Sequence, residues 1–195
     1  LAAMGEVIII RPVEEHGGAG VVSVSHGSDY DGFEFLYRYR NAGELAGLLQ
    51  LTGVRKIQIH HLVGFGPSLR RAVALAKVPY SFHVHDYYTV CPQITLTDSD
   101  GNYCGEPDQN GCDACIAQRP SHGAADIRNW RVKHEWSILG AQEVFAPCVD
   151  AASRIQHYIG VPVLPVYHQD MPAHGSRPPR LGPGQRPYRI VLLGA

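Results

Sequence analysis

The sequence has no long apolar run, no secretion signal and no excess of charge of either sign. Within its 195 residues, no apolar stretch approaches the roughly 20 residues that span a bilayer. Leu1 to Ile10 lack the basic region and the small-residue cleavage site of a signal peptide. The 17 basic and 18 acidic side chains give a formal net charge of −1, so no broad positive field steers the chain onto a polyanion. We expect a cytoplasmic protein that does not bind nucleic acid.

The sequence also lacks an internal repeat and a low-complexity tract, which excludes a solenoid. Its composition, 45% hydrophobic and 18% charged, suits one well-packed domain. Segments rich in Val and Ile alternate with helical patterns, which favours a mostly parallel sheet covered by helices. The predicted strands are 7–10, 21–25, 33–37, 57–60, 80–85, 144–146 and 163–166.

Four segments have helical periodicity. The residues that would share a helix face are Leu69, Ala72, Val73 and Ala76; Leu45, Leu48 and Leu49; Ala125, Val132, Trp136 and Leu139; and Ala152, Ile155 and Ile159. Asn41 and Glu44 precede the second stripe at the spacing of a capping box. By contrast, segments 21–25 and 33–37 flank a turn-rich stretch and predict a hairpin.

Histidines gather at two predicted strand ends. One group is His60 and His61, and the other is His83, His85 and Asp86 in the string HVHD. Ligands of open α/β sheets bind at the carboxyl ends of the strands, so both groups are candidate binding residues. An imidazole can donate a hydrogen bond to a hydroxyl or phosphate oxygen, and a carboxylate can orient it. Buried histidines satisfied by backbone carbonyls are the alternative.

Four of the five cysteines, Cys91, Cys104, Cys112 and Cys115, have the spacing C-x12-C-x7-C-x2-C in a polar stretch. In a reducing compartment such a cluster favours a metal site over disulfides. Four thiolates would complete a tetrahedral zinc site and leave no position for a substrate, so the zinc would be structural. An iron–sulfur cluster, unmetallated thiols and disulfides remain alternatives.

Two further segments bear on function and domain boundaries. Gly17 and Gly18 form a glycine-rich turn that could approach a phosphate, although a plain hairpin turn explains them as well. Residues 171–188 are rich in proline and glycine and predict a linker after a domain over 1–170. The apolar 189–195 (RIVLLGA) then predicts the first strand of a further, truncated domain.

Residues 79–116 run H-D, then C-P, then C and C-x-x-C, and this order resembles family 4 glycosyltransferases of bacteria. The strand IQIHHLVG and the segment VFAPCVDAASRIQHYIG extend the similarity over roughly residues 45–166. The resemblance implies the amino-terminal half of a GT-B enzyme: a Rossmann-like three-layer α/β/α domain, here with an irregular cysteine-containing loop inserted. It also implies retaining chemistry without a catalytic metal.

By the same resemblance, His85 and Asp86 would line the cleft at the transferred sugar, and His60 and His61 would face the acceptor. Gly17 and Gly18 would lie near the donor diphosphate. The nucleotide-sugar donor would be held mostly by a carboxy-terminal domain, and the acceptor would be a saccharide or a lipid-linked saccharide in polysaccharide or cell-surface glycan synthesis. The full protein could then associate peripherally with the inner face of the membrane, and this chain alone would be inactive.

Two other functions fit parts of the pattern. A metal-dependent hydrolase would use the histidines and Asp86 as ligands of a catalytic metal with an open coordination position. A zinc-stapled interaction domain would present the cysteine loop to a partner and bind no sugar.

Overall fold

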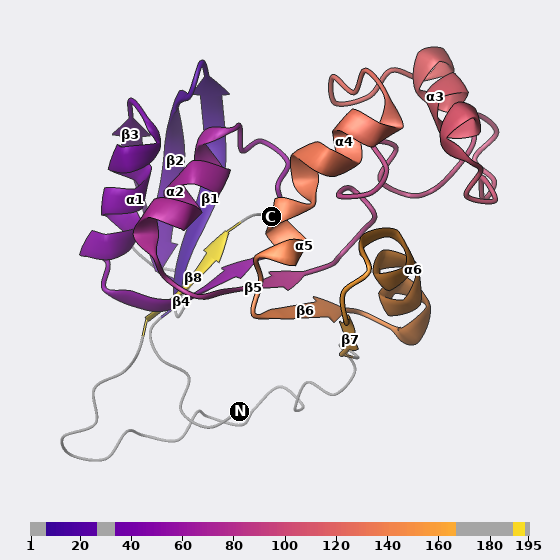
Figure 1. The fold of residues 1–195 in the computed structure, drawn as a ribbon. Helices are drawn as coiled ribbons and strands as arrows, with labels where there is room; N and C mark the ends of the chain where they lie inside the picture. The colour runs from indigo at the N-terminus through magenta and orange to yellow at the C-terminus, as the bar shows by residue number, and fades with distance from the viewer. Residues whose placement is uncertain (1–6, 27–33, 167–188, 194–195) are drawn as a thin grey trace. The chain divides into compact units, whose positions relative to one another are not determined.

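The computed structural model describes residues 7–26, 34–166 and 189–193, and Figure 1 shows its ribbon. The chain divides into two compact units, residues 1–83 with 167–195 and residues 84–166. Among the helices in the described ranges, none combines the length and apolarity that crossing a bilayer requires.

The first unit contains a mixed sheet. Its described strands are β1 (Val7–His16), β2 (Ala19–His26), β3 (Glu34–Tyr39), β4 (Val54–Ile59), β5 (Tyr80–His83) and β8 (Arg189–Leu193). They lie in the order β3-β2-β1-β8-β4-β5. The strands β1, β8, β4 and β5 are parallel, whereas β1, β2 and β3 are antiparallel. A mixed α/β fold with a parallel sheet is therefore confirmed, as is the predicted antiparallel pairing of 21–25 with 33–37.

A two-residue turn joins β1 to β2. His16 pairs with Ala19, and Gly17 and Gly18 between them have φ of 60° and 89°. Tight hairpin turns of this kind need positive φ at both central positions, which glycine adopts without steric cost. The chain consequently returns as a second strand at the point where a dinucleotide-binding fold would begin a helix.

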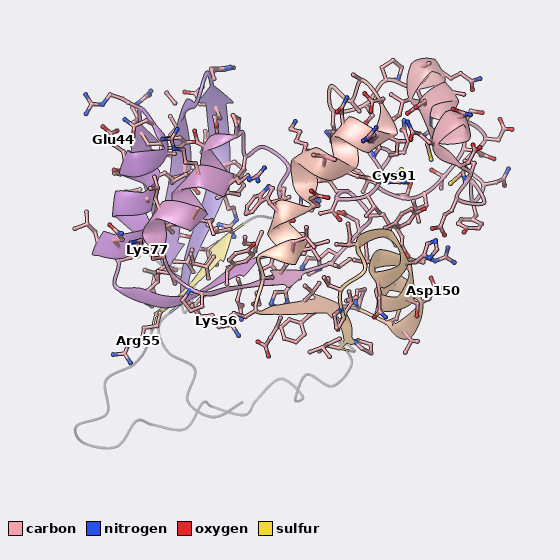
Figure 2. All side chains as sticks on the ribbon, viewed as in Figure 1. Glu44, Arg55, Lys56, Lys77, Cys91 and Asp150 are labelled. Atoms are coloured by element: carbon pink, nitrogen blue, oxygen red, sulfur yellow. The ribbon has the colours of Figure 1, made fainter. Side chains whose placement is uncertain are left out.

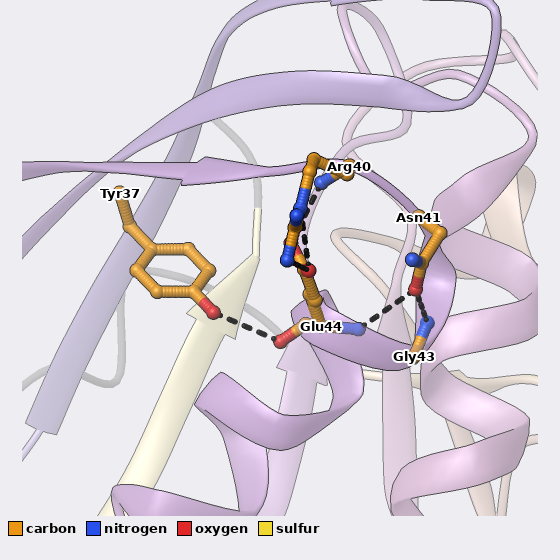
Figure 3. A network of polar contacts seen from close by, with 5 residues as sticks. All are labelled: Tyr37, Arg40, Asn41, Gly43 and Glu44. Carbon is orange, nitrogen blue, oxygen red and sulfur yellow. Dashed lines mark hydrogen bonds and ion pairs between the residues drawn. The ribbon is translucent and has the colours of Figure 1, made fainter.

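Helix α1 (Ala42–Leu51) begins at a side-chain cap, shown in Figure 3. The Oδ1 of Asn41 accepts hydrogen bonds from the backbone N–H groups of Gly43 at 2.9 Å and Glu44 at 3.1 Å. The Glu44 carboxylate reaches back and accepts the backbone N–H of Arg40 at 2.9 Å. The predicted cap at Asn41 is confirmed, with Glu44 bonded to the residue before it and not to Asn41 itself.

Helix α2 (Ser68–Ala76) packs against α1, and the two lie in front of β1 and β2 in Figure 1. The side chains of both predicted stripes are buried, which confirms these two helices and their inner faces. The buried stripe residues are Leu45, Leu48, Leu49, Leu69, Ala72, Val73 and Ala76.

Strand β8 lies between β1 and β4 and is parallel to both. Val191 and Leu193 are buried there, at 0% and 1% exposure. The sequence predicts that 189–195 form the first strand of a further, truncated domain. A short apolar strand gains most by pairing with an existing sheet, because each of its backbone groups then has a partner. That these residues open a further domain stays a prediction.

The second unit has the short parallel pair β6 (Glu143–Ala146) and β7 (Leu164–Pro165). Its described helices are α3 (Gln109–Gln118), α4 (Ile127–His134), α5 (Trp136–Leu139) and α6 (Val149–Ile159). Helix α3 lies within the cysteine-rich stretch, which the sequence analysis treated as an irregular loop. The helix buries only Ile116, so it has no apolar stripe that would reveal it.

The prediction that Ala125, Val132, Trp136 and Leu139 share the face of one helix is wrong, because two helices cover this segment and Ala125 precedes both. Val132 and Leu139 are 52% and 51% exposed, and the residues that α4 buries are Ile127, Trp130 and His134. Two causes explain the error. The chain ends α4 and begins α5 at Glu135, so one face does not continue through both helices. In addition, His134 occupies a position on the inner face of α4 where the pattern calls for an apolar residue.

We expect Asn41→Ala to weaken α1, because two backbone N–H groups lose their acceptor. The loss should be about 1 kcal/mol of local stability. Faster hydrogen–deuterium exchange across 42–51 would report it. Asn41→Asp, which keeps a capping oxygen, is the matched control and should exchange like the wild type; equal exchange in Asn41→Ala and the wild type would contradict the assigned cap.

Candidate functional site

The ends of β4 and β5 bring two of the candidate histidines together. The strands are parallel neighbours with Ile59 opposite Phe82, so the next residues along each, His60 and His83, are also close. Their rings stack with centroids 4.5 Å apart and planes 15° apart. Both residues are half-buried, and the Nε2 atom of His60 is itself buried. The pair lies at the carboxyl edge of the parallel strands.

The neighbouring histidine serves the local backbone. The Nδ1 of His61 accepts the backbone N–H of Val63 at 2.9 Å, which closes the turn after β4. The His83 Nε2 lies 3.3 Å from the Ser81 hydroxyl oxygen. Both His61 and His83 thus have local polar partners.

His85 and Asp86 lie at the start of the second unit, directly after Val84. His85 is exposed, and Asp86 is half-buried. One carboxylate oxygen of Asp86 accepts the backbone N–H of Tyr88 at 2.8 Å, the pattern by which Asp shapes a turn two residues on. Asp86 thus directs the chain from the strand end toward Cys91. The catalytic roles predicted for His85 and Asp86 stay predictions.

Gly17 and Gly18 lie at the tip of the β1–β2 hairpin, and the nearest helix terminus already holds an anion. The Glu15 carboxylate accepts the backbone N–H groups of Gly66 at 2.8 Å and Ser68 at 3.2 Å, at the start of α2. This carboxylate occupies the place where a helix N-terminus would otherwise attract a phosphate. The diphosphate role of the two glycines stays a prediction without structural support.

Sequence reasoning missed Glu15, which ties three elements of the first unit together. Besides capping α2, its carboxylate accepts the Tyr39 hydroxyl at 2.7 Å. Burial, together with this bond to an anion, raises the pKa of Tyr39. A Cβ at Gly66 would collide with the Glu15 carboxylate. One signal for this role was available. Helix α2 begins at Pro67, which has no side chain that could cap the helix, so a capping group had to come from elsewhere in the chain.

The four candidate cysteines face one cavity in the second unit. Its volume is about 30 Å³. The lining residues are Cys91, Pro92, Gln93, Thr97, Cys104, Pro107, Cys112, Cys115, Ile116 and Ile127. Cys91 is labelled in Figure 2, where sulfur is yellow. Cys148, which precedes α6, lies outside the described wall of this cavity.

Three local structures deliver these thiols. Cys112 and Cys115 lie three apart on α3, and that spacing puts both on one helix face. Asp108 caps this helix by accepting the backbone N–H of Gly111 at 2.9 Å. Cys91 ends a turn in which its N–H donates to the Tyr87 carbonyl at 2.8 Å. Cys104 follows a small hairpin closed by the bridge between Thr97 and Tyr103.

Arg119 joins the hairpin to the end of α3. Its guanidinium donates to the Thr97 carbonyl at 2.8 Å and also to the Asp98 carbonyl. The Arg119 carbonyl in turn accepts the side-chain amide of Gln93 at 2.5 Å. These bonds keep the three cysteine-bearing pieces together, although few apolar side chains are available to do so.

Burial raises the pKa of three thiols, Cys91, Cys104 and Cys112. For Cys91 the proximity of the other three sulfurs adds to the effect, and a hydrogen bond from the Gln93 backbone opposes it. Thiolates are the ligands that zinc and iron–sulfur clusters prefer. Over the described ranges, no three Cys, His, Asp or Glu side chains already have an arrangement that could hold a metal ion.

Helix α4 holds the segment that leads from Asp86 to Cys91. The Trp130 indole N–H donates to the Tyr88 carbonyl at 2.7 Å, and the Arg131 Nε donates to the Val90 carbonyl at 3.0 Å. The Tyr88 ring meets the rings of Trp130 and His134 edge-on, each with a centroid separation of 5.0 Å. The segment that precedes Cys91 is therefore held by side chains of α4.

No protein-family model, curated protein or solved structure matches the chain. The structure is that of a mixed α/β protein. It has a stacked histidine pair at a parallel sheet edge and a cysteine-lined cavity in a separate unit.

We expect the second unit to lose stability between about pH 6.5 and pH 4. Burial lowers the pKa of His134 from 6.5 to about 4, so the unfolded chain binds a proton in this window and the folded chain does not. Stability therefore falls as the pH falls, by at most about 3 kcal/mol. The fluorescence of Trp130 and Trp136, both in this unit, would follow urea unfolding at each pH.

His134→Gln should have a smaller pH dependence in this window than the wild type. The exposed His157→Gln should keep the full dependence and is the matched control. If both variants lose stability with pH as the wild type does, His134 is not the group responsible.

Proposed function

We propose that this chain is the acceptor-side part of a retaining glycosyltransferase with a GT-B fold, and that its parallel strands belong to a Rossmann-like domain. The observation that carries the proposal is the stacked pair His60 and His83 at the ends of β4 and β5. Ligands of parallel sheets bind at this edge, and imidazoles there can hydrogen-bond the hydroxyls of a saccharide.

The resemblance of residues 79–116 to family 4 glycosyltransferases supplies the reaction. His85, with Asp86 beside it, would contact the transferred sugar or its phosphate. A neutral imidazole would donate a hydrogen bond at the face where the acceptor hydroxyl attacks, and electrostatic stabilisation of the departing nucleoside diphosphate would supply most of the catalysis. No catalytic metal takes part.

The partners follow from the same proposal. A nucleotide-sugar donor would be bound mainly by a carboxy-terminal domain, and a saccharide or lipid-linked saccharide would be the acceptor. The reaction would take place in the cytoplasm, at the inner face of the membrane when the acceptor is a lipid.

Two observations favour the transferase over a metal-dependent hydrolase. The planes of His60 and His83 are 15° apart and overlap face to face, whereas imidazoles that ligate one ion point their nitrogens at a common centre. One carboxylate oxygen of Asp86 already accepts a backbone N–H. A zinc-stapled interaction domain explains the cysteine cavity but gives the stacked histidines no role.

We expect the chain to bind saccharides weakly and to have no turnover by itself. A titration with maltose, lactose and mannobiose, followed by the side-chain NMR signals of His60 and His83, would detect binding at the sheet edge. His60→Ala and His83→Ala should each weaken it about tenfold, the loss of one or two hydrogen bonds.

The matched control is His16→Ala, since His16 is an exposed histidine at the tip of the β1–β2 hairpin. This variant should bind saccharides like the wild type. Signals of His60 and His83 that respond to none of these sugars would argue against an acceptor site here. Turnover of UDP-glucose or GDP-mannose by the chain alone would contradict the assignment of the donor site to another domain.

A further inference from the structure

The cysteine cavity has no role in the proposed transferase, and its construction calls for a separate explanation. Four thiols from three local structures, separated by as many as 24 positions in the sequence, line one cavity of about 30 Å³. The fifth cysteine, Cys148, lies outside the described wall. Unrelated surface thiols would have no reason to converge in this way.

The cysteine sulfurs are the principal atoms of the cavity wall that could bind a metal ion. Pro92, Pro107, Ile116 and Ile127 form apolar sides. A volume of about 30 Å³ accommodates one or two atoms the size of a water oxygen. The cavity thus matches a single ion better than a cubane cluster of eight iron and sulfur atoms.

The surrounding backbone is held in conformations that cost free energy. Ile94, Leu96 and Glu106 have φ of 67°, 55° and 51°, in the left-handed region that side chains, and β-branched ones above all, disfavour. A residue in such a conformation persists only where other interactions impose it. All three lie within five residues of Cys91 or Cys104.

Apolar packing contributes little to holding helix α3, which polar bonds join to its neighbours. Ile116 is its one buried side chain among the residues described. A tether through Cys112 and Cys115 would fix the helix to the hairpin and to the turn at Cys91.

We propose that Cys91, Cys104, Cys112 and Cys115 together bind one zinc ion that fastens α3 and the 97–103 hairpin to the segment beginning at Asp86. Binding converts four thiols and one Zn²⁺ into a tetrathiolate complex and releases four protons to the solvent, with no change of oxidation state. Four thiolates fill the tetrahedral shell, so the ion is structural. The zinc site stands independently of the transferase proposal.

The first test is the metal content of the whole chain, produced in zinc-supplemented medium and purified with a reductant and without chelators. Elemental analysis should find about one zinc per chain, and X-ray absorption should find four sulfur neighbours at about 2.3 Å. A shell with nitrogen or oxygen ligands, iron in place of zinc, or no zinc after incubation with one equivalent of ZnCl₂ under reductant would each overturn the proposal.

Variants identify the ligands. Cys104→Ser and Cys115→Ser should each lose most of the zinc, and Cys148→Ser, the matched control, should keep it. Full zinc content in Cys104→Ser would overturn the assignment of that ligand.

Because a ligand variant could fail to fold, chelation of the wild-type chain gives a second readout. Removal of zinc should speed hydrogen–deuterium exchange in α3, residues 109–118, and leave α1, residues 42–51, unchanged. Unchanged exchange in α3 after complete removal of zinc would show that the ion does not anchor this helix.

Discussion

The parallel pairing of β4 with β5 is the constraint on which the candidate ligand site depends. Ile57 and Ile59 are completely buried, and Phe82 is 4% exposed, so the hydrophobic effect fixes both strands in one register. With Ile59 opposite Phe82, the histidines that follow are neighbours, and their rings stack. A shift of one residue would turn the buried isoleucines toward solvent and separate the two rings.

The second unit relies on different forces. Its cysteine-rich stretch contributes few apolar side chains. Specific hydrogen bonds and ion pairs, and not apolar packing, hold this stretch together. Arg119 binds two carbonyls of the small hairpin, and Asp98 at the hairpin turn accepts the backbone N–H groups of Asp100 and Asn102. Arg154 adds ion pairs with Glu106 and Asp150. Such bonds give a loop its shape at little net gain in stability, which leaves a structural role for a metal.

The part of the fold that could be predicted is the part in which local patterns and burial agree. The stripe from Leu69 to Ala76 and the cap at Asn41 followed from spacing alone, because each depends on residues three or four positions apart. Helix α3 could not be predicted this way, since it has Gly111, two cysteines and one buried residue. The inner face of α4 was predicted wrongly because a buried histidine, His134, looks like a surface residue in the sequence.

The sequence by itself determined the residue types available for chemistry, namely histidines after two apolar strands and four cysteines in one polar stretch, because these follow from composition and local order. Tertiary structure alone decided their arrangement. It stacked His83 on His60, gave His61 and Asp86 to local turns, placed the Glu15 carboxylate at the start of α2, and brought Cys91 to the same cavity as α3. Contacts between residues far apart in the chain depend on strand register and helix packing. Many buried side chains together determine this register and packing, so no local stretch of sequence reveals the contacts.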